Sequence, residues 1–317
     1  MQSSPGGGYA PLREGAAWLD LSARGRIAVR GQDRSRLLHA MCTNRVEGLE
    51  CGQGCYAFFL SAQGRILGDA YLLSRQDHIL LDTEPETASS LAAHIEKHII
   101  ADDAALEDLR QTTCAIGIEG PHAAKTLAAL GAPAPQAAFA HREWNARLVA
   151  ALSVTGQPGY RIIAPAGEQA HLIAELESAG AAPASPEAAR AVRLENGRPR
   201  YGEDITESNL AQETQLTLAL NFNKGCYLGQ EIVERVRARG HVNRLLVRLA
   251  IEAGVPPLPG SRLMDGAADA GAVTSAAFSP ALGHVVALAY VRADLAKTGA
   301  AFTVNGCRAV ISASRPG

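Results

Sequence analysis

Apolar and polar positions follow two different periods along the chain, and the changes of period divide it into short elements. The apolar runs Arg26 to Arg30 and Tyr56 to Leu60 have the length of strands. In Ile66 to Leu73 successive side chains alternate between two faces, as in a strand, and the polar turn before it predicts a β-hairpin. Between these runs, Asp33 to Met41 repeats apolar residues at helical spacing. The first part of the chain is therefore predicted to mix strands and helices.

The same mixture continues to about Gly240. Proline and serine at helix starts, and glycine at helix ends, place several of the boundaries. We predict further strands at His78 to Asp82, Cys114 to Ile118, Leu148 to Val154 and Tyr160 to Ala164, and helices at Thr87 to Ile99, Pro121 to Leu130, Glu168 to Ala179 and Ser185 to Glu195. Strands and helices that follow one another in this way indicate an α+β fold.

From Asn243 onward only short strands are predicted, separated by turn residues. The last of them contains Asn305-Gly306, a dipeptide typical of a tight hairpin turn. Several short strands at close spacing favour a small antiparallel barrel. The five segments are Leu245 to Ile251, Gly260 to Met264, Ala272 to Phe278, Val285 to Val291 and Phe302 to Ile311.

Composition narrows the class of protein without naming a function. The 317 residues suffice for two or three domains, and 30 basic against 32 acidic residues give no excess for binding nucleic acid or a membrane surface. The N-terminus resembles no signal peptide and no apolar stretch is long enough to span a bilayer, so we expect a cytoplasmic protein. Six scattered cysteines indicate free thiols, and His94 with His98 more plausibly forms a half-buried helix face than a metal site.

The segment Asn223 to Gly240 holds the densest candidate chemistry. Cys226 stands after Gly225, Lys224 precedes it by two residues, and a helical pattern begins after Gly229. A nearby cation and a helix start both favour the thiolate form of a cysteine, so Cys226 and Lys224 are candidate catalytic residues. The alternative is a small apolar side chain at a tight turn.

Asp69 is a third candidate catalytic residue. On the strand Ile66 to Leu73 it shares a face with Leu67, Tyr71 and Leu73. A carboxylate among apolar side chains must find a partner or shift its pKa. It either pairs with an arginine or a backbone amide, or it contacts the amine of a ligand.

Three segments of this sequence resemble one protein superfamily. The motif K-G-C-Y-x-G-Q-E around Cys226 resembles the signature of the YgfZ family of folate-binding proteins, which is related to the glycine cleavage T-protein, an aminomethyltransferase. R-x-E-x-G-x-P-x-Y-G-x-D, from Arg193 to Asp204, and the C-terminal strands are similar to the same superfamily. The resemblance implies a clover-leaf of two α+β subdomains, residues 1–110 and 111–240, and a C-terminal antiparallel β-barrel, residues 241–317.

The resemblance also implies a ligand and the residues that hold it. The ligand is tetrahydrofolate or a one-carbon derivative, and Glu195 corresponds to the glutamate that recognises the pterin ring, since one carboxylate can accept from two adjacent N–H donors. Glu195 can otherwise pair with Arg193 or Arg198. Tyr201 belongs to the same motif, and Asp69 matches the catalytic aspartate of T-proteins, although Gly68 replaces the second aspartate usual there. Further candidates for the folate carboxylates are Arg235, Arg237 and Arg239, which can equally form a solvated helix face.

Three functions follow from these resemblances. The first is a tetrahydrofolate-binding protein that supports iron–sulfur enzymes, including tRNA-modifying ones, through a reactive Cys226; T-proteins lack a cysteine at this position, which favours this reading. The second is a folate-dependent aminomethyl- or methyltransferase that uses Asp69. The third is a non-enzymatic scaffold. We expect a monomer whose partners are a folate and iron–sulfur enzymes or their assembly proteins, with no direct contact to nucleic acid or membrane and no bound metal.

Overall fold

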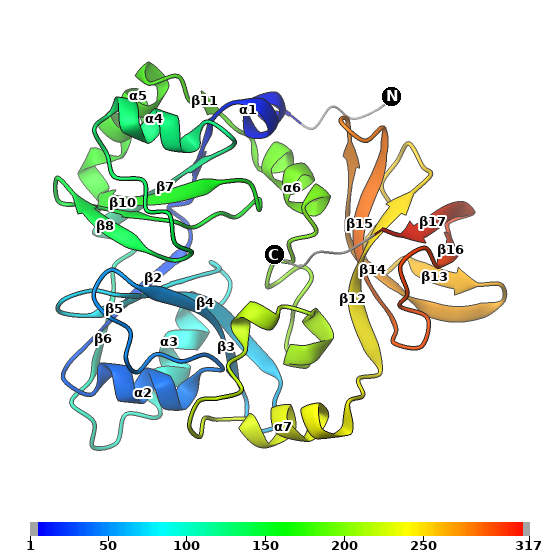
Figure 1. Cartoon of the computed structure of the whole chain (residues 1–317), viewed down its shortest axis with the longest axis horizontal. Coiled ribbons are helices and arrows are strands. Elements are labelled where there is room, and N and C mark those ends of the chain that lie inside the picture. Colours follow the sequence, from blue (N-terminus) through cyan, green and yellow to red (C-terminus); the bar gives the residue numbers. More distant parts are fainter. Residues whose placement is uncertain (1–5, 313–317) are drawn as a thin grey trace.

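The computed structural model describes residues 6–312 and arranges them in three units around a common centre (Figure 1). Two units are built on β-sheets that carry helices, and the third is a closed barrel. The predicted α+β clover-leaf with a C-terminal antiparallel barrel is therefore confirmed. The unit boundaries after residues 110 and 240 remain a proposal.

The first sheet is antiparallel and buried on both faces. Its order is β3-β4-β5-β2-β6. Helices α2 and α3 cover one face, where Leu38 and Leu91 join its core. Because both faces are covered, its central strands are apolar almost throughout, whereas β6 at the edge is mostly exposed and polar and gave no strand pattern. The elements are β2 (Gly25–Arg30), α2 (Arg34–Met41), β3 (Gly54–Leu60), β4 (Ile66–Ser74), β5 (Ile79–Thr83), α3 (Ala88–Glu96) and β6 (Ala105–Asp108).

The second sheet has the order β11-β1-β7-β10-β9-β8. Strand β1 pairs antiparallel with β7, so the N-terminal segment joins this sheet before the chain enters the first one. The sequence pattern missed α1 and four short strands, β1, β8, β9 in part and β11, because runs this short have no clear period. The elements are α1 (Tyr9–Glu14), β1 (Ala17–Asp20), β7 (Thr113–Glu119), α4 (Ala123–Ala129), β8 (His141–Trp144), β9 (Arg147–Ala150), β10 (Gly159–Pro165), α5 (Gln169–Ser178) and β11 (Ala182–Pro183).

The two sheets face each other across a shared core. Tyr56 and Phe58 from the first sheet pack with Leu148 and Ile163 from the second. The segment after residue 200 closes this core with two 3-10 turns, η2 (Ala211–Thr214) and η3 (Thr217–Ala219). Tyr227 and Val233 of α7 (Gln230–Arg239) also belong to it.

Helix α6 (Pro186–Glu195) joins the second sheet to the barrel. The Ser185 hydroxyl accepts a hydrogen bond from the Ala188 amide at 3.1 Å, which confirms the predicted cap, and Gly197 ends the helix with a φ of 67°. Leu194 packs against outward-facing residues of the barrel, including Leu246 and Tyr290. Helix α6 thus holds the barrel at a fixed place beside the two sheets (Figure 1).

The barrel closes in the order β12-β15-β14-β13-β16-β17. Asn305 and Gly306 connect the last two strands with φ values of 49° and 80°, so the predicted hairpin turn is confirmed. Its strands are β12 (Arg244–Ile251), β13 (Arg262–Asp265), β14 (Ala268–Ser279), β15 (His284–Arg292), β16 (Ala301–Val304) and β17 (Cys307–Ile311). Within residues 6–312, no helix has the length and apolar character needed to cross a bilayer.

Candidate functional site

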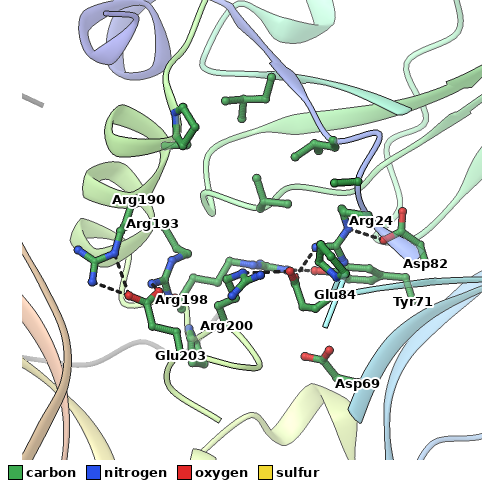
Figure 2. A pocket seen from close by; sticks show the side chains of 18 of the residues that line it. Arg24, Asp69, Tyr71, Asp82, Glu84, Arg190, Arg193, Arg198, Arg200 and Glu203 are labelled. Atoms are coloured by element: carbon green, nitrogen blue, oxygen red, sulfur yellow. Dashed lines mark hydrogen bonds and ion pairs between the residues drawn. The ribbon is translucent and has the colours of Figure 1, made fainter. Parts of the chain in front are cut away.

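A cavity of about 600 Å³ lies between the two sheets and α6 (Figure 2). Ligand sites commonly have this size, and they combine apolar walls with a few fixed polar groups. Here β1 and η3 provide apolar wall residues, among them Trp18 and Leu218, while β4, β5 and α6 provide charged ones. The cavity therefore has the size and lining of a site for a small organic molecule.

Asp69 lies in the wall of this cavity, on β4. Its side chain is buried, and its Oδ2 accepts a hydrogen bond from the Tyr56 hydroxyl at 2.5 Å. Burial, and then the negative charge of Glu84, raise the pKa of Asp69 to about 6, although the Tyr56 hydrogen bond acts in the opposite direction. The sequence predicted a carboxylate that finds a partner or shifts its pKa, and Asp69 does both.

Arginines provide half of the charged wall, and sequence reasoning did not select any of them as ligand-binding. On one side Arg24 donates to Asp82 at 2.7 Å and also pairs with Glu84. Arg200 pairs with Glu84 at 3.0 Å and with Glu86 at 2.6 Å. The arginines that line the cavity are Arg24, Arg190, Arg193, Arg198 and Arg200.

The opposite wall carries a second ion-pair cluster (Figure 2). Arg190 and Arg193 of α6 both pair with Glu203, and Arg193 also pairs with Asp204 at 2.6 Å. Several of these arginines stand in or beside the motif that the sequence singled out for Glu195. Their spacing could have drawn attention to them, whereas nothing in the sequence marks Arg24.

Two family models match the chain along most of its length. The GCVT N-terminal domain matches residues 8–224, and the glycine cleavage T-protein C-terminal barrel domain matches residues 244–313. The chain belongs to the glycine cleavage T-protein family. The barrel found in the structure is thus the second domain of that family.

Similar proteins include named transferases, and a solved structure shares the fold. An aminomethyltransferase of Rubrobacter xylanophilus is 29% identical, over 89% of this chain and 78% of its own length. A putative chloroplastic transferase of Arabidopsis thaliana is 28% identical, over 92% of this chain and 68% of its own length. The crystal structure of aminomethyltransferase T from Bartonella henselae has the same fold, with a TM-score of 0.89 at 24% identity over 96% of this chain and 87% of its own.

In this T-protein family member, Glu195 lies away from the cavity lining. The buried carboxylate at the end of α6 accepts hydrogen bonds from the Tyr9 hydroxyl, from Arg13 at 2.9 Å and from Ser279 of the barrel at 2.6 Å. For a structural role we expected Glu195 to pair with Arg193 or Arg198. This expectation is wrong, because the ion-pair partner of Glu195 is Arg13 of α1. Glu195 connects α1, α6 and the barrel, and its part in binding a pterin stays a prediction.

The other predicted folate contacts also lie outside the lining. The buried Tyr201 hydroxyl donates to the Ile66 carbonyl at 3.1 Å. On the exposed face of α7, Arg235 pairs with Glu231 at 2.7 Å. Arg237 stacks over the Phe222 ring at 4.6 Å and Arg239 is exposed, so all three arginines lie on a solvated helix face, and their contact with a folate carboxylate stays a prediction.

Asp69 lines the cavity, whereas Lys224 and Cys226 are not among its lining residues. The Lys224 ammonium donates to the carbonyls of His39, Cys42 and Asn44, the last two at 2.6 and 2.9 Å. These bonds use all three of its donors at the C-terminal end of α2. Burial lowers the pKa of Lys224, and Cys226 is exposed. The structure does not bring Cys226, Glu195 and Asp69 into one pocket.

His94 and His98 lie side by side on α3 and the turn after it. Their ring centroids are 4.9 Å apart, and both side chains are half-buried. The part of the chain that the structure describes contains no group of three or more histidine, cysteine or acidic residues able to hold a metal ion. The pair therefore lacks the ligands for a metal centre within this region.

Proposed function

We propose that this chain transfers a one-carbon group, aminomethyl or methyl, with tetrahydrofolate or a one-carbon derivative as its reaction partner. Asp69 carries the proposal. It is a carboxylate held by Tyr56 in the wall of a ligand-sized cavity, with a pKa close to the pH at which an enzyme works. The names of several relatives, which are aminomethyltransferases, support the same reading.

The cavity fits a folate in size and in chemistry. Its volume and apolar walls suit a flat ring system, and Asp69 offers a carboxylate to a ring N–H or amine. Tetrahydrofolate, when bound, supplies the amine nitrogen that receives or gives up the one-carbon group. When the folate amine receives the group, the ionised Asp69 carboxylate orients this amine and takes its proton. The new N–C bond forms as the bond between that carbon and the donor breaks, and the electron pair leaves with the donor, while Tyr56 holds the carboxylate in place.

A calorimetric titration of the whole protein with tetrahydrofolate tests the proposal. We expect saturable binding by the wild-type protein. If Glu195 contacts the pterin ring, Glu195→Ala weakens this binding. An unchanged dissociation constant in Glu195→Ala, with a lower unfolding midpoint, would restrict Glu195 to its observed role between α1, α6 and the barrel. Failure of the wild-type protein to bind any folate would leave a scaffold as the remaining function.

An exposed thiol favours a second candidate function. Cys226 lies on the surface outside the cavity, where it is accessible to another protein. This position suits the YgfZ-type function, in which a folate-binding protein supports iron–sulfur enzymes, including tRNA-modifying ones, through a reactive cysteine. In that case the cysteine acts on a partner protein and the folate stays in the cavity.

Two substitutions in the cysteine motif separate chemistry from structure. Lys224→Met is expected to lower the free energy of unfolding by about 1–3 kcal/mol, because three carbonyls at the end of α2 lose their donor. Cys226→Ala is expected to change it by less than about 0.5 kcal/mol, because the side chain is exposed. Urea unfolding measures both.

Cys226→Ala also decides between the two functions. If the thiol acts on partners, cells that carry this variant lose iron–sulfur enzyme activity, while the purified variant binds tetrahydrofolate as the wild type does. Normal iron–sulfur enzyme activity in those cells would eliminate the thiol role and leave the transferase.

A further inference from the structure

The hydroxyl of Tyr71 has a proton to donate and, within residues 6–312, no residue that accepts it. Tyr71 lies on β4 in the wall of the cavity. Its oxygen accepts a hydrogen bond from the Arg198 guanidinium, and the described part of the chain offers no acceptor for the O–H itself. A tyrosine hydroxyl carries one proton, and an arginine can only donate. The Tyr71 proton is therefore available to a ligand.

Packing fixes the ring that carries this hydroxyl. The ring centroids of Tyr56 and Phe139 lie 5.1 and 5.8 Å from that of Tyr71, and the Arg161 guanidinium lies 5.7 Å from the same centroid. Figure 2 shows the side chains of Tyr71 and Arg198 approaching each other from different sides of the cavity. With its ring held in this way, Tyr71 keeps its hydroxyl at one place in the wall.

The positive charge beside the Tyr71 oxygen is not neutralised by a neighbouring carboxylate. Arg198 forms no ion pair within 4 Å among residues 6–312. Arg161 is paired with Asp82, so it does not add to this charge. The other arginines of the wall are also paired with carboxylates: Arg24, Arg190, Arg193 and Arg200. An unneutralised guanidinium in contact with the Tyr71 oxygen stabilises negative charge that develops on this oxygen.

Asp69 and Tyr71 are placed to act on one reaction. They lie two positions apart on β4, so their side chains leave the same face of the sheet about 7 Å apart. Asp69 accepts a hydrogen bond from Tyr56, and Tyr71 accepts one from Arg198. One wall of the cavity thus presents a fixed proton acceptor and a fixed proton donor next to each other.

We propose that Tyr71 is the general acid of the transfer and gives its proton to the leaving atom of the one-carbon donor. Arg198 is a positioning residue, which holds the Tyr71 oxygen and neutralises the tyrosinate that forms. The inference rests on the proposed transferase function and adds a second catalytic residue to Asp69. Such an acid serves donors that carry the carbon on sulfur or nitrogen and depart as a thiol or an amine.

The step balances in atoms and in charge. The N–C bond to the folate amine forms, the bond between the carbon and the leaving atom breaks, and its electron pair stays on the leaving atom. The amine proton goes to Asp69 and the Tyr71 proton goes to the leaving atom, so nothing is oxidised or reduced. One negative charge thereby moves from Asp69 to Tyr71, where Arg198 faces it. Proton transfer through water from Asp69 to Tyr71 then restores both groups.

Two synthetic donors test the role of Tyr71 with tetrahydrofolate as acceptor. They are dimethylaminomethyl sulfides whose leaving group is ethanethiol or 4-nitrobenzenethiol, and the released thiol is measured. Ethanethiolate is strongly basic and needs a proton as it departs, whereas 4-nitrobenzenethiolate departs readily without one. Tyr71→Phe is expected to lower kcat for the ethyl sulfide about a hundredfold and for the nitrophenyl sulfide less than about tenfold, with little change in KM.

Variants of Arg198 test the same step without altering the tyrosine. Arg198→Met is expected to lower kcat for the ethyl sulfide about tenfold and to spare the nitrophenyl sulfide, because the tyrosinate loses its stabilising charge. Arg198→Lys keeps the charge and is expected to restore part of the rate. Tyr290→Phe is the matched control and is expected to leave both rates unchanged. The Tyr290 hydroxyl is buried on the barrel, outside the cavity, without a hydrogen-bond partner within residues 6–312.

Three results would overturn the inference. If Tyr71→Phe slows both sulfides equally while it folds and binds tetrahydrofolate as the wild type does, Tyr71 does not protonate the leaving atom. If Arg198→Met has no effect on the ethyl sulfide, Arg198 does not support the acid. If the wild type binds tetrahydrofolate but releases thiol from neither sulfide, the cavity takes no donor of this class. Absence of folate binding by the wild type is a separate outcome, in which the proposed function fails as well.

Discussion

Replacing Asp69 by asparagine is expected to lower the rate of one-carbon transfer about 10²–10⁴-fold. Asparagine keeps the shape of the side chain and can still accept a hydrogen bond from Tyr56, but it cannot take up a proton from a bound amine. Tetrahydrofolate binding, measured by calorimetry, is expected to persist. A variant that retains wild-type turnover would remove Asp69 from the chemistry and with it the main support for a transferase.

The pH dependence of the same reaction gives an independent test. The base must be ionised, and the pKa of Asp69 is about 6, so the rate is expected to rise with pH through about 6 and then to level off. Tyr56→Phe removes a hydrogen bond that favours the ionised carboxylate. The pH at which the rate rises is therefore expected to increase by about one pH unit. If the rate of Tyr56→Phe rises at the same pH as that of the wild type, the titrating group is not Asp69.

The largest loss of stability is expected from Asp82→Asn. Asp82 is fully buried on β5 and faces two arginines, Arg24 at 2.7 Å and Arg161 at 2.5 Å. The contact to Arg161 is an ion pair without the alignment of a hydrogen bond. The substitution leaves the buried Arg161 without its ion-pair partner, while Arg24 keeps Glu84, and an uncompensated buried charge costs about 3–5 kcal/mol. Urea unfolding at neutral pH measures the difference.

An exposed aspartate on the same unit provides the control. Asp77 pairs with Arg30 at the surface, and Asp77→Asn is expected to change the free energy of unfolding by about 0–1 kcal/mol. The arginines hold the pKa of Asp82 below its ordinary value despite burial, which acts to raise it. Its stabilising contribution is therefore present above about pH 4 and declines as the pH falls toward the folded-state pKa, so wild type and Asp82→Asn are expected to converge in acid. Equal losses for the two variants at neutral pH would contradict the buried-pair argument.

Much of the architecture could be predicted from the sequence. The alternation in Ile66 to Leu73, the cap at Ser185 and the turn at Asn305-Gly306 are local features, and local backbone preferences fixed them where they were expected. Burial of Asp69 could also be predicted, since its place among apolar residues on one face of a strand depends only on the period of that strand. The sequence pattern did not predict short or edge strands such as β1 and β6, because strands elsewhere in the chain stabilise them by pairing.

In the candidate site, too, some features depend on local sequence and others on tertiary contacts. The sequence determined that Asp69 would be a carboxylate among apolar side chains that must find a partner or shift its pKa, and that a helix would begin after Gly229. Only the tertiary structure decided that five arginines line the cavity, that Lys224 binds carbonyls at the end of α2, and that Glu195 pairs with Arg13. The physical reason is that a charged side chain takes its role from the nearest opposite charge or free carbonyl, and in a folded chain that partner often lies more than a hundred residues away.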